Sequence, residues 1–99
     1  MALARFGFIV KGPGYVLGEH SAQLESNVFY TSVIGVPDLL GAFAAAKFML
    51  NDGIQLIELC GGFSEEEAAE MRLSIDEKVP VGVVVYDAKS LDRIQKLFG

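Results

Sequence analysis

The chain has 99 residues, a net charge of −5 and a single cysteine, which fits one domain, residues 1–99, that folds without an internal disulfide. Its eight basic residues are scattered singly, and charged residues interrupt every apolar stretch before the ~20 residues of a bilayer span, so we expect neither nucleic-acid binding nor a membrane segment. Because the amino-terminal segment lacks a signal-peptide pattern and one cysteine agrees with a reducing compartment, we expect a cytoplasmic protein.

The first two strands are predicted from apolar runs that end at turn residues. Phe6 to Val10 is wholly apolar and is followed by Lys11-Gly12-Pro13-Gly14, which is typical of a strand buried on both faces. Val28 to Val36 is rich in β-branched and aromatic residues and ends before a proline. The segment between them, Tyr15 to Asn27, is polar and irregular. We expect a loop there, with room for about two helical turns near Glu19 to Glu25.

Leu39 to Asn51 is predicted to be a helix with both ends marked. Asp38 precedes it as an N-cap, and Gly53 follows it in position for the left-handed turn that closes a helix. Apolar residues form two stripes along this helix, so we expect it to need packing partners on two sides. The stripes are Leu39, Ala42, Phe43, Ala46 and Leu50, and Leu40, Ala44 and Phe48.

The second half of the chain alternates strands and helices. Ile54 to Cys60 is the third predicted strand, and a helix follows from Glu65 to about Ile75, behind a capping box that begins at Ser64. Val79 to Tyr86 is the fourth predicted strand, and Ser90 to Phe98 is a closing helix. The residues expected to face the sheet are Ala68, either Met71 or the stem of Arg72, and Ile75 in the first of these helices, and Leu91, Ile94, Leu97 and Phe98 in the second.

Strands joined through helices lie parallel and connect by right-handed crossovers. The sequence therefore predicts a small α/β domain with a four-stranded, mostly parallel sheet and three main helices. Two strand orders remain open, a flavodoxin-like open sheet 2-1-3-4 and a half-barrel 1-2-3-4, and the apolar first strand favours a central position and so the open sheet. Because 52% of the residues are hydrophobic, above the ~45 to 50% of ordinary domains, we expect apolar surface to be left for a homo-oligomer, most simply a dimer.

Residues with useful chemistry follow the predicted strands, at the end of a parallel sheet where ligands bind. Glu58 interrupts an apolar strand, and two interpretations are open: a general base or ligand anchor beside Lys11, or a carboxylate satisfied by loop amides or a subunit contact. Cys60 lies just before a helix start, where backbone amides can lower a thiol pKa. His20 is the only histidine and can reach the same end as an activating base, and an inert cysteine is the alternative.

Two glycine-containing turns are candidate ligand sites. Gly61-Gly62-Phe63-Ser64 precedes a helix and resembles an anion cradle, although it lacks the spacing of phosphate-binding loops and three glutamates follow it; a plain tight turn is the alternative. Lys11 and Gly12 begin the other turn, and Asp87 follows the fourth strand. One histidine, one cysteine and no paired carboxylates give no convincing metal site, and no cofactor is indicated.

Several short motifs are spread over the whole chain. They are Gly12-Pro13-Gly14-Tyr15 after an apolar strand, His20 in the next loop, Ile34-Gly35-Val36, Ile57 to Phe63, Val81-Gly82 and the closing Phe98-Gly99. In these motifs the chain resembles a family of prokaryotic proteins of about this length, catalogued as a domain of unknown function. The resemblance implies a stand-alone α/β domain with no assigned activity, whose Glu58-Leu59-Cys60-Gly61 segment looks like the family's signature.

Two functions are open at this stage. The first is a small-molecule-binding domain, with catalysis undecided, whose pocket at the strand ends is lined by Lys11, His20, Glu58, Cys60 and Asp87. The second is a homo-oligomeric structural or protein-interaction module without a ligand. The two are compatible, because a pocket can form between subunits.

Overall fold

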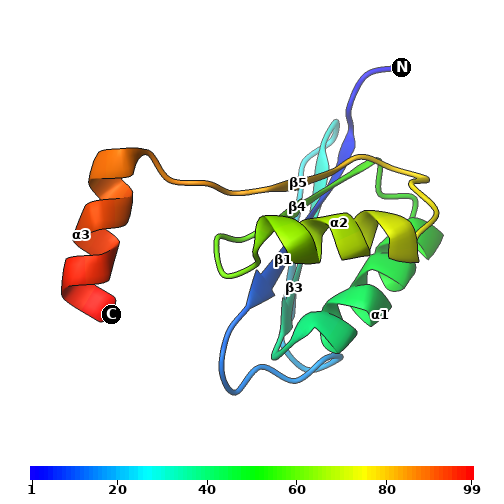
Figure 1. Ribbon diagram of the computed structural model, residues 1–99. Coiled ribbons are helices and arrows are strands. Elements are labelled where there is room, and N and C mark those ends of the chain that lie inside the picture. The colour runs from blue at the N-terminus through cyan, green and yellow to red at the C-terminus, as the bar shows by residue number, and fades with distance from the viewer.

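The strands form one sheet, and the two helices that lie between strands in the chain cover one of its faces (Figure 1). The computed structural model describes residues 1–99. Its strands are β1 (Arg5–Lys11), β2 (Ser21–Glu25), β3 (Tyr30–Val36), β4 (Leu56–Leu59) and β5 (Val81–Val83), and its helices are α1 (Leu39–Asn51), α2 (Glu65–Ser74) and α3 (Ala88–Phe98). None of these helices combines the length and apolar character needed to cross a membrane.

The sheet has the order β2-β3-β1-β4-β5. The four predicted strands are all present, parallel to one another, with β1 at the centre between β3 and β4. The half-barrel alternative is therefore wrong. The expected four-stranded flavodoxin-like sheet differs in detail from the structure, because β2 adds a fifth, antiparallel strand beside β3 and makes the sheet mixed.

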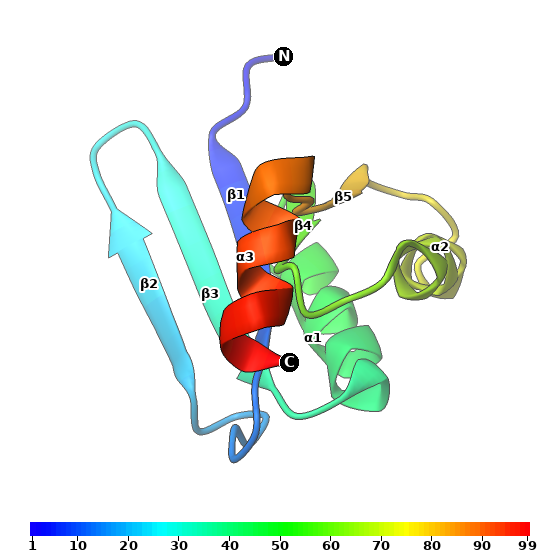
Figure 2. The same ribbon diagram turned by 60° about the vertical axis from the view of Figure 1, so that its left-hand side comes forward.

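β2 stands where the sequence predicts a loop and helical turns near Glu19 to Glu25, and that prediction is wrong. The strand pairs with β3 along its whole length in a hairpin (Figure 2). Ser26 closes the hairpin, because its hydroxyl accepts hydrogen bonds from the amides of Val28 and Phe29 at 3.2 and 3.0 Å. Helix-forming residues adopt a strand here because a helix of two turns is marginal, whereas pairing with β3 satisfies the backbone.

α1 begins and ends where the sequence predicts. The carboxylate of Asp38 accepts the amide of Gly41 at 2.9 Å, and Gly53 takes the left-handed φ of 76° just after the helix. The helix lies so close to β1 that a Cβ atom added to Gly7 would be 2.5 Å from the sulfur of Met49. The second predicted stripe has no partner in this chain, since Leu40 and Phe48 remain 75% and 60% exposed.

α2 also follows its prediction. Ser64 and Glu67 form the complete capping box, and Ala68, Met71 and Ile75 are buried against the sheet. The core therefore lies between one face of the sheet and the two helices. Its largest fully buried side chains are Ile9, Val36, Met49, Ile57, Leu59 and Met71.

The other face of the sheet, called the open face below, has no helix packed on it (Figures 1 and 2). Side chains of a strand alternate between faces, so the neighbours of the buried Gly7 and Ile9 point to this side, and the strand register places their partners beside them. The open face consists of Phe6, Phe8, Val10, Ala22, Leu24, Thr31, Val33, Leu56 and Glu58. β1 is thus covered on one face by the chain's own helices, and the expectation of a strand buried on both faces is not met within this chain.

α3 does not pack on the sheet, so the prediction that its apolar residues face the sheet is wrong. None of its residues is buried, and Leu97 and Phe98 are 64% and 81% exposed. The helix stands clear of the open face at the end of an extended linker, residues 84–87 (Figure 1). Only residues 81–83 of the predicted fourth strand pair in the sheet, because the neighbouring strand β4 ends at Leu59. The amide of Val84 still donates one hydrogen bond to the carbonyl of Leu59.

Candidate functional site

The carboxyl ends of β1, β3 and β4 meet at one edge of the sheet, where α1 and α2 also begin. Two groups of residues gather there. One is a polar network between β1 and the start of α2, and the other is a hollow on the open face.

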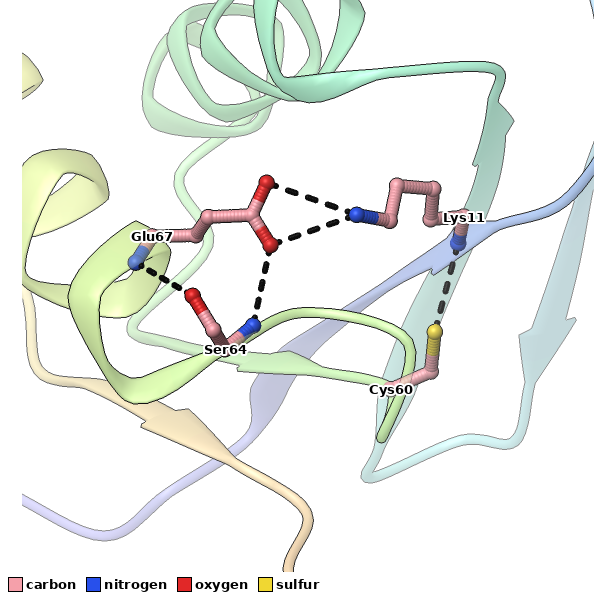
Figure 3. A network of polar contacts seen from close by, with 4 residues as sticks. All are labelled: Lys11, Cys60, Ser64 and Glu67. Atoms are coloured by element: carbon pink, nitrogen blue, oxygen red, sulfur yellow. Dashed lines mark hydrogen bonds and ion pairs between the residues drawn. The ribbon is translucent and has the colours of Figure 1, made fainter. Parts of the chain in front are cut away.

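The polar network centres on Glu67 (Figure 3). Its carboxylate accepts the amide of Ser64 at 2.9 Å and lies 3.2 Å from the ammonium of Lys11, while the hydroxyl of Ser64 accepts the amide of Glu67 at 3.0 Å. The Lys11 ammonium also lies 4.9 Å from the centre of the Phe63 ring. The Ser64 amide, with the added attraction of Lys11, holds the pKa of Glu67 below its usual value.

This network already satisfies the groups that the sequence suggests for an anion. The carboxylate of Glu67 takes the Ser64 amide and the Lys11 charge, which are the donors that a bound anion would use. Gly61 lies beneath the ring of Tyr86, since an added Cβ would be 2.6 Å from the Tyr86 hydroxyl. The Gly61-Gly62 turn therefore makes room for a side chain of the linker.

Cys60 and His20 make separate contacts. The sulfur of Cys60 accepts the backbone amide of Lys11 at 3.3 Å (Figure 3). The Nδ1 atom of His20 accepts the amide of Val16 at 2.9 Å, and its ring lies 5.4 Å from the ring of Tyr15. No hydrogen bond joins the thiol to the imidazole, so the structure does not assemble the nucleophile and base considered above.

Glu58 and Asp87 also lie apart from the network. Glu58 is half-buried on the open face, in register with Phe8 and Gly82. Its carboxylate forms no hydrogen bond or ion pair, because Lys11, its predicted neighbour, pairs with Glu67. Asp87 is the N-cap of α3, and the hydrogen bond from the Ser90 amide lowers its pKa. No three His, Cys, Asp or Glu side chains gather at one point to hold a metal ion.

The hollow on the open face has a volume of about 220 Å³ and lies between the carboxyl end of β1 and the start of β2. Its position follows from the strand register, because Ala22 of β2 lies opposite Val33 of β3 and both point to the open face. Tyr15 folds over β3, where a Cβ on Gly35 would be 2.9 Å from its ring. The lining residues are Val10, Tyr15, His20, Ser21, Ala22, Val33 and Gly35.

The hollow is mostly apolar, with His20 as its polar side chain. Because Nδ1 of His20 accepts the Val16 amide, the neutral imidazole carries its proton on Nε2 and can donate one hydrogen bond. Ser21 borders the hollow, but its register opposite Ile34 directs its side chain to the other face of β2. The arrangement can thus hold a small molecule by apolar contact and direct its acceptor group.

A second hollow, of about 410 Å³, lies on the other side of the β1 end. It contains Lys11 and Gly12, two of the predicted ligand-binding residues, together with Asp38 and Glu67. Lys11 is the single cation of this hollow and is paired with Glu67, one of its two carboxylates. The net charge of the lining is therefore negative and would repel an anion.

Residues 4–99 match the sequence model of a family of unknown function, DUF6506. The chain belongs to this family. The resemblance to a domain family of unknown function that was noted from the sequence motifs is therefore confirmed. No curated protein and no solved structure shows significant similarity to the chain.

Membership of DUF6506 brings no assigned activity, so the site carries the functional argument. Of the candidate site residues named from the sequence, only His20 lines the open-face hollow, although the motif residues Tyr15 and Gly35 lie there too. Sequence reasoning missed the other members, Val10, Tyr15, Ser21, Ala22, Val33 and Gly35. The alternation of small or apolar with polar residues in Ser21 to Glu25 is a signal that would have revealed β2, and with it one wall of the hollow.

Proposed function

We propose that this member of DUF6506 binds a small, mostly apolar molecule in the open-face hollow, with the ligand's acceptor group directed at His20. One observation supports the proposal. Apolar side chains, the ring of Tyr15 and the Nε2 donor of His20 surround a single hollow at the carboxyl ends of parallel strands.

The size and charge of the hollow restrict the ligand. A volume of about 220 Å³ is below the ~300 to 1,000 Å³ of drug-sized ligand sites, which favours a compact ring or branched molecule. No Lys or Arg lines the hollow, which disfavours phosphates. A carbonyl or a single carboxylate fits the Nε2 donor of His20.

The proposal concerns binding and assigns no reaction. Cys60, the one thiol, lines neither hollow, and its sulfur is engaged with the Lys11 amide. Glu58 lies on the same face of the sheet as the hollow but is not among its lining residues.

The test is a thermal-shift and calorimetric screen of the full chain against small ring-containing carbonyl compounds and carboxylates. A ligand at a hundred times its dissociation constant should add about 2.7 kcal/mol to the free energy of unfolding. Ala22→Phe fills the hollow and should abolish binding, while Gln23→Phe, on the other face of the same strand, should retain it. His20→Ala should weaken binding roughly tenfold, the effect of losing one hydrogen bond.

Two results would end the proposal. One is a screen in which no compound stabilises the chain. The other is a ligand that Ala22→Phe and Gln23→Phe bind equally well, because such a ligand would lie elsewhere on the molecule.

The second candidate function is a homo-oligomeric interaction module. The observation that favours it is the apolar surface that the chain leaves uncovered on α3 and on the open face. Light scattering at micromolar concentration tests it, and a monomer would count against it.

A further inference from the structure

α3 and the open face both carry apolar side chains that the chain leaves without a partner. Leu91, Ile94 and Phe98 follow the spacing of one helix face, with Leu97 beside them, and none of them is buried. The open face presents the half-buried rings of Phe6 and Phe8 without a covering element. An isolated helix of 11 residues is marginal in water, so α3 needs a packing surface to be stable.

The charges of the two parts are also complementary. Residues 88–99 contain three basic and one acidic side chain, a net charge of +2, whereas residues 1–87 contain five basic and twelve acidic side chains, a net charge of −7. Glu58, on β4, is the one acidic residue of the open face. A basic amphipathic helix is therefore attracted to this acidic domain, and its apolar side favours the open face.

The exposed area has the size that an interface requires. A compact protein of 10.7 kDa exposes about 5,500 Å², whereas this chain exposes 6426 Å². The excess of about 900 Å² is close to the ~800 Å² that each partner buries in a standard interface. The radius of gyration, 14.0 Å, likewise exceeds the ~12.6 Å expected for 99 residues.

The linker directs α3 away from its own sheet. The amide of Val84 donates to the carbonyl of Leu59, and the ring of Tyr86 rests on Gly61, so the linker is held at two points before α3 begins. Figure 1 shows α3 on the side of the open face but clear of it, and in Figure 2 the helix stands in front of β1 and β4.

We infer that two copies of the chain exchange α3, each laying the apolar side of this helix on the open face of the other. Because every chain carries both the helix and the face, a two-fold axis satisfies both surfaces at once and closes the assembly as a dimer. Lys89, Arg93 and Lys96 lie on the opposite side of the helix, so their charge attracts the acidic domain as a whole and not one carboxylate of the open face.

The exchanged helix also covers the open-face hollow. Val10 and Val33 belong both to the open face and to the lining of the hollow, so a helix that crosses this face walls the hollow from solvent. The exchange is inferred from α3 and the sheet and does not depend on a ligand. Its tests contain no ligand, so their failure would leave the binding proposal untouched.

The first test is sedimentation velocity of the full chain and two variants. The wild type should have twice the 10.7 kDa mass of one chain at micromolar concentration. Ile94→Asp places a charge in the apolar face of α3 and should raise the dimer dissociation constant roughly 100-fold or more. Gln95→Asp adds the same charge beside that face and should remain dimeric. Because α3 packs on no core residue of its own chain, both variants should stay folded and keep the wild-type amide shifts of the buried residues of α1 and α2.

The second test identifies which copy α3 contacts. In a mixture of isotope-labelled and unlabelled chains, isotope-filtered nuclear Overhauser spectra should connect the methyl groups of Ile94 in one chain to the ring of Phe8 in another. A monomeric wild type would overturn the inference, as would an Ile94→Asp variant that dimerises as well as Gln95→Asp. Contacts confined to one chain would show that α3 folds back on its own sheet, which also overturns the exchange.

Discussion

Lys11 and Glu67 form an ion pair of 3.2 Å that ties the end of β1 to the first turn of α2. Because Glu67 also completes the capping box, one carboxylate fixes the start of the helix and its position against the central strand. The pair lies at the edge of the sheet where both hollows open.

Glu67→Gln should make the protein less stable at neutral pH and less sensitive to acid. Glutamine can complete the capping box but cannot pair with Lys11, so the loss is about 0.5 kcal/mol. The pKa of Glu67 is lower in the folded state than its usual value of 4.5. Its contribution is therefore complete above about pH 4.5 and is lost as the pH falls through the lowered pKa. Urea unfolding at pH 7 and pH 3 measures the difference, which should be present at pH 7 and vanish at low pH. Glu66→Gln is the control.

Tyr30→Phe should destabilise the opposite edge of the sheet and remove a dependence on alkaline pH. The Tyr30 hydroxyl donates to Asp52 at 3.0 Å, and the guanidinium of Arg5 lies 4.2 Å from the centre of its ring. Loss of this hydrogen bond should cost about 1 kcal/mol.

Burial, together with the Asp52 hydrogen bond, raises the pKa of Tyr30 above 10.0. The stability it contributes is complete below pH 10 and is lost as the pH rises through the raised pKa. Absorbance at 295 nm should show one of the three tyrosines ionising late, and this late step should be missing in Tyr30→Phe. Three tyrosines that titrate together in the wild type would contradict the assignment.

Gly7→Ala should destabilise the fold by about 1 to 3 kcal/mol, the cost of overpacking a core. The added Cβ would lie 2.5 Å from the sulfur of Met49 and 3.0 Å from a methyl group of Ile54, both buried. Gly82→Ala is the matched control, because its nearest neighbour is 4.0 Å away. Chemical denaturation of both variants makes the comparison, and equal midpoints would mean that α1 does not approach β1 this closely.

Gly61→Ala should loosen the linker without unfolding the domain. The new Cβ would meet the exposed ring of Tyr86, which can swing into solvent, so the midpoint of unfolding should change little. The amide relaxation of residues 84–87 should then report faster motion than in the wild type or in Gly62→Ala. Unchanged relaxation in Gly61→Ala would show that Tyr86 does not hold the linker.

Local signals predicted most of the fold. Asp38 and Gly53 mark the two ends of α1, and Ser64 marks the start of α2, because caps act within a few residues of the helix that they close. The central place of β1 followed from its apolar character and is confirmed. These features depend on neighbours in the chain or on composition alone.

The errors concern contacts between distant segments. β2 is exposed and rich in helix-forming residues, so the short polar and apolar alternation of Ser21 to Glu25 favours a strand decisively only together with the pairing to β3. α3 has a clear apolar face, but a pattern cannot say which surface that face meets. For the same reason His20 was noticed as a lone histidine, whereas its neighbours in the hollow come from β1, β2, β3 and the loop that holds Tyr15, and gave no joint signal.

The measurement that tests the account most directly is a titration of the full chain with the screened fragments, followed by amide chemical shifts. The account predicts saturable shifts at Ala22, Val33 and Gly35 that disappear in Ala22→Phe and persist in Gln23→Phe. Shifts that cluster at Lys11, Asp38 and Glu67 instead, or no saturable shift with any fragment, would contradict a ligand site on the open face.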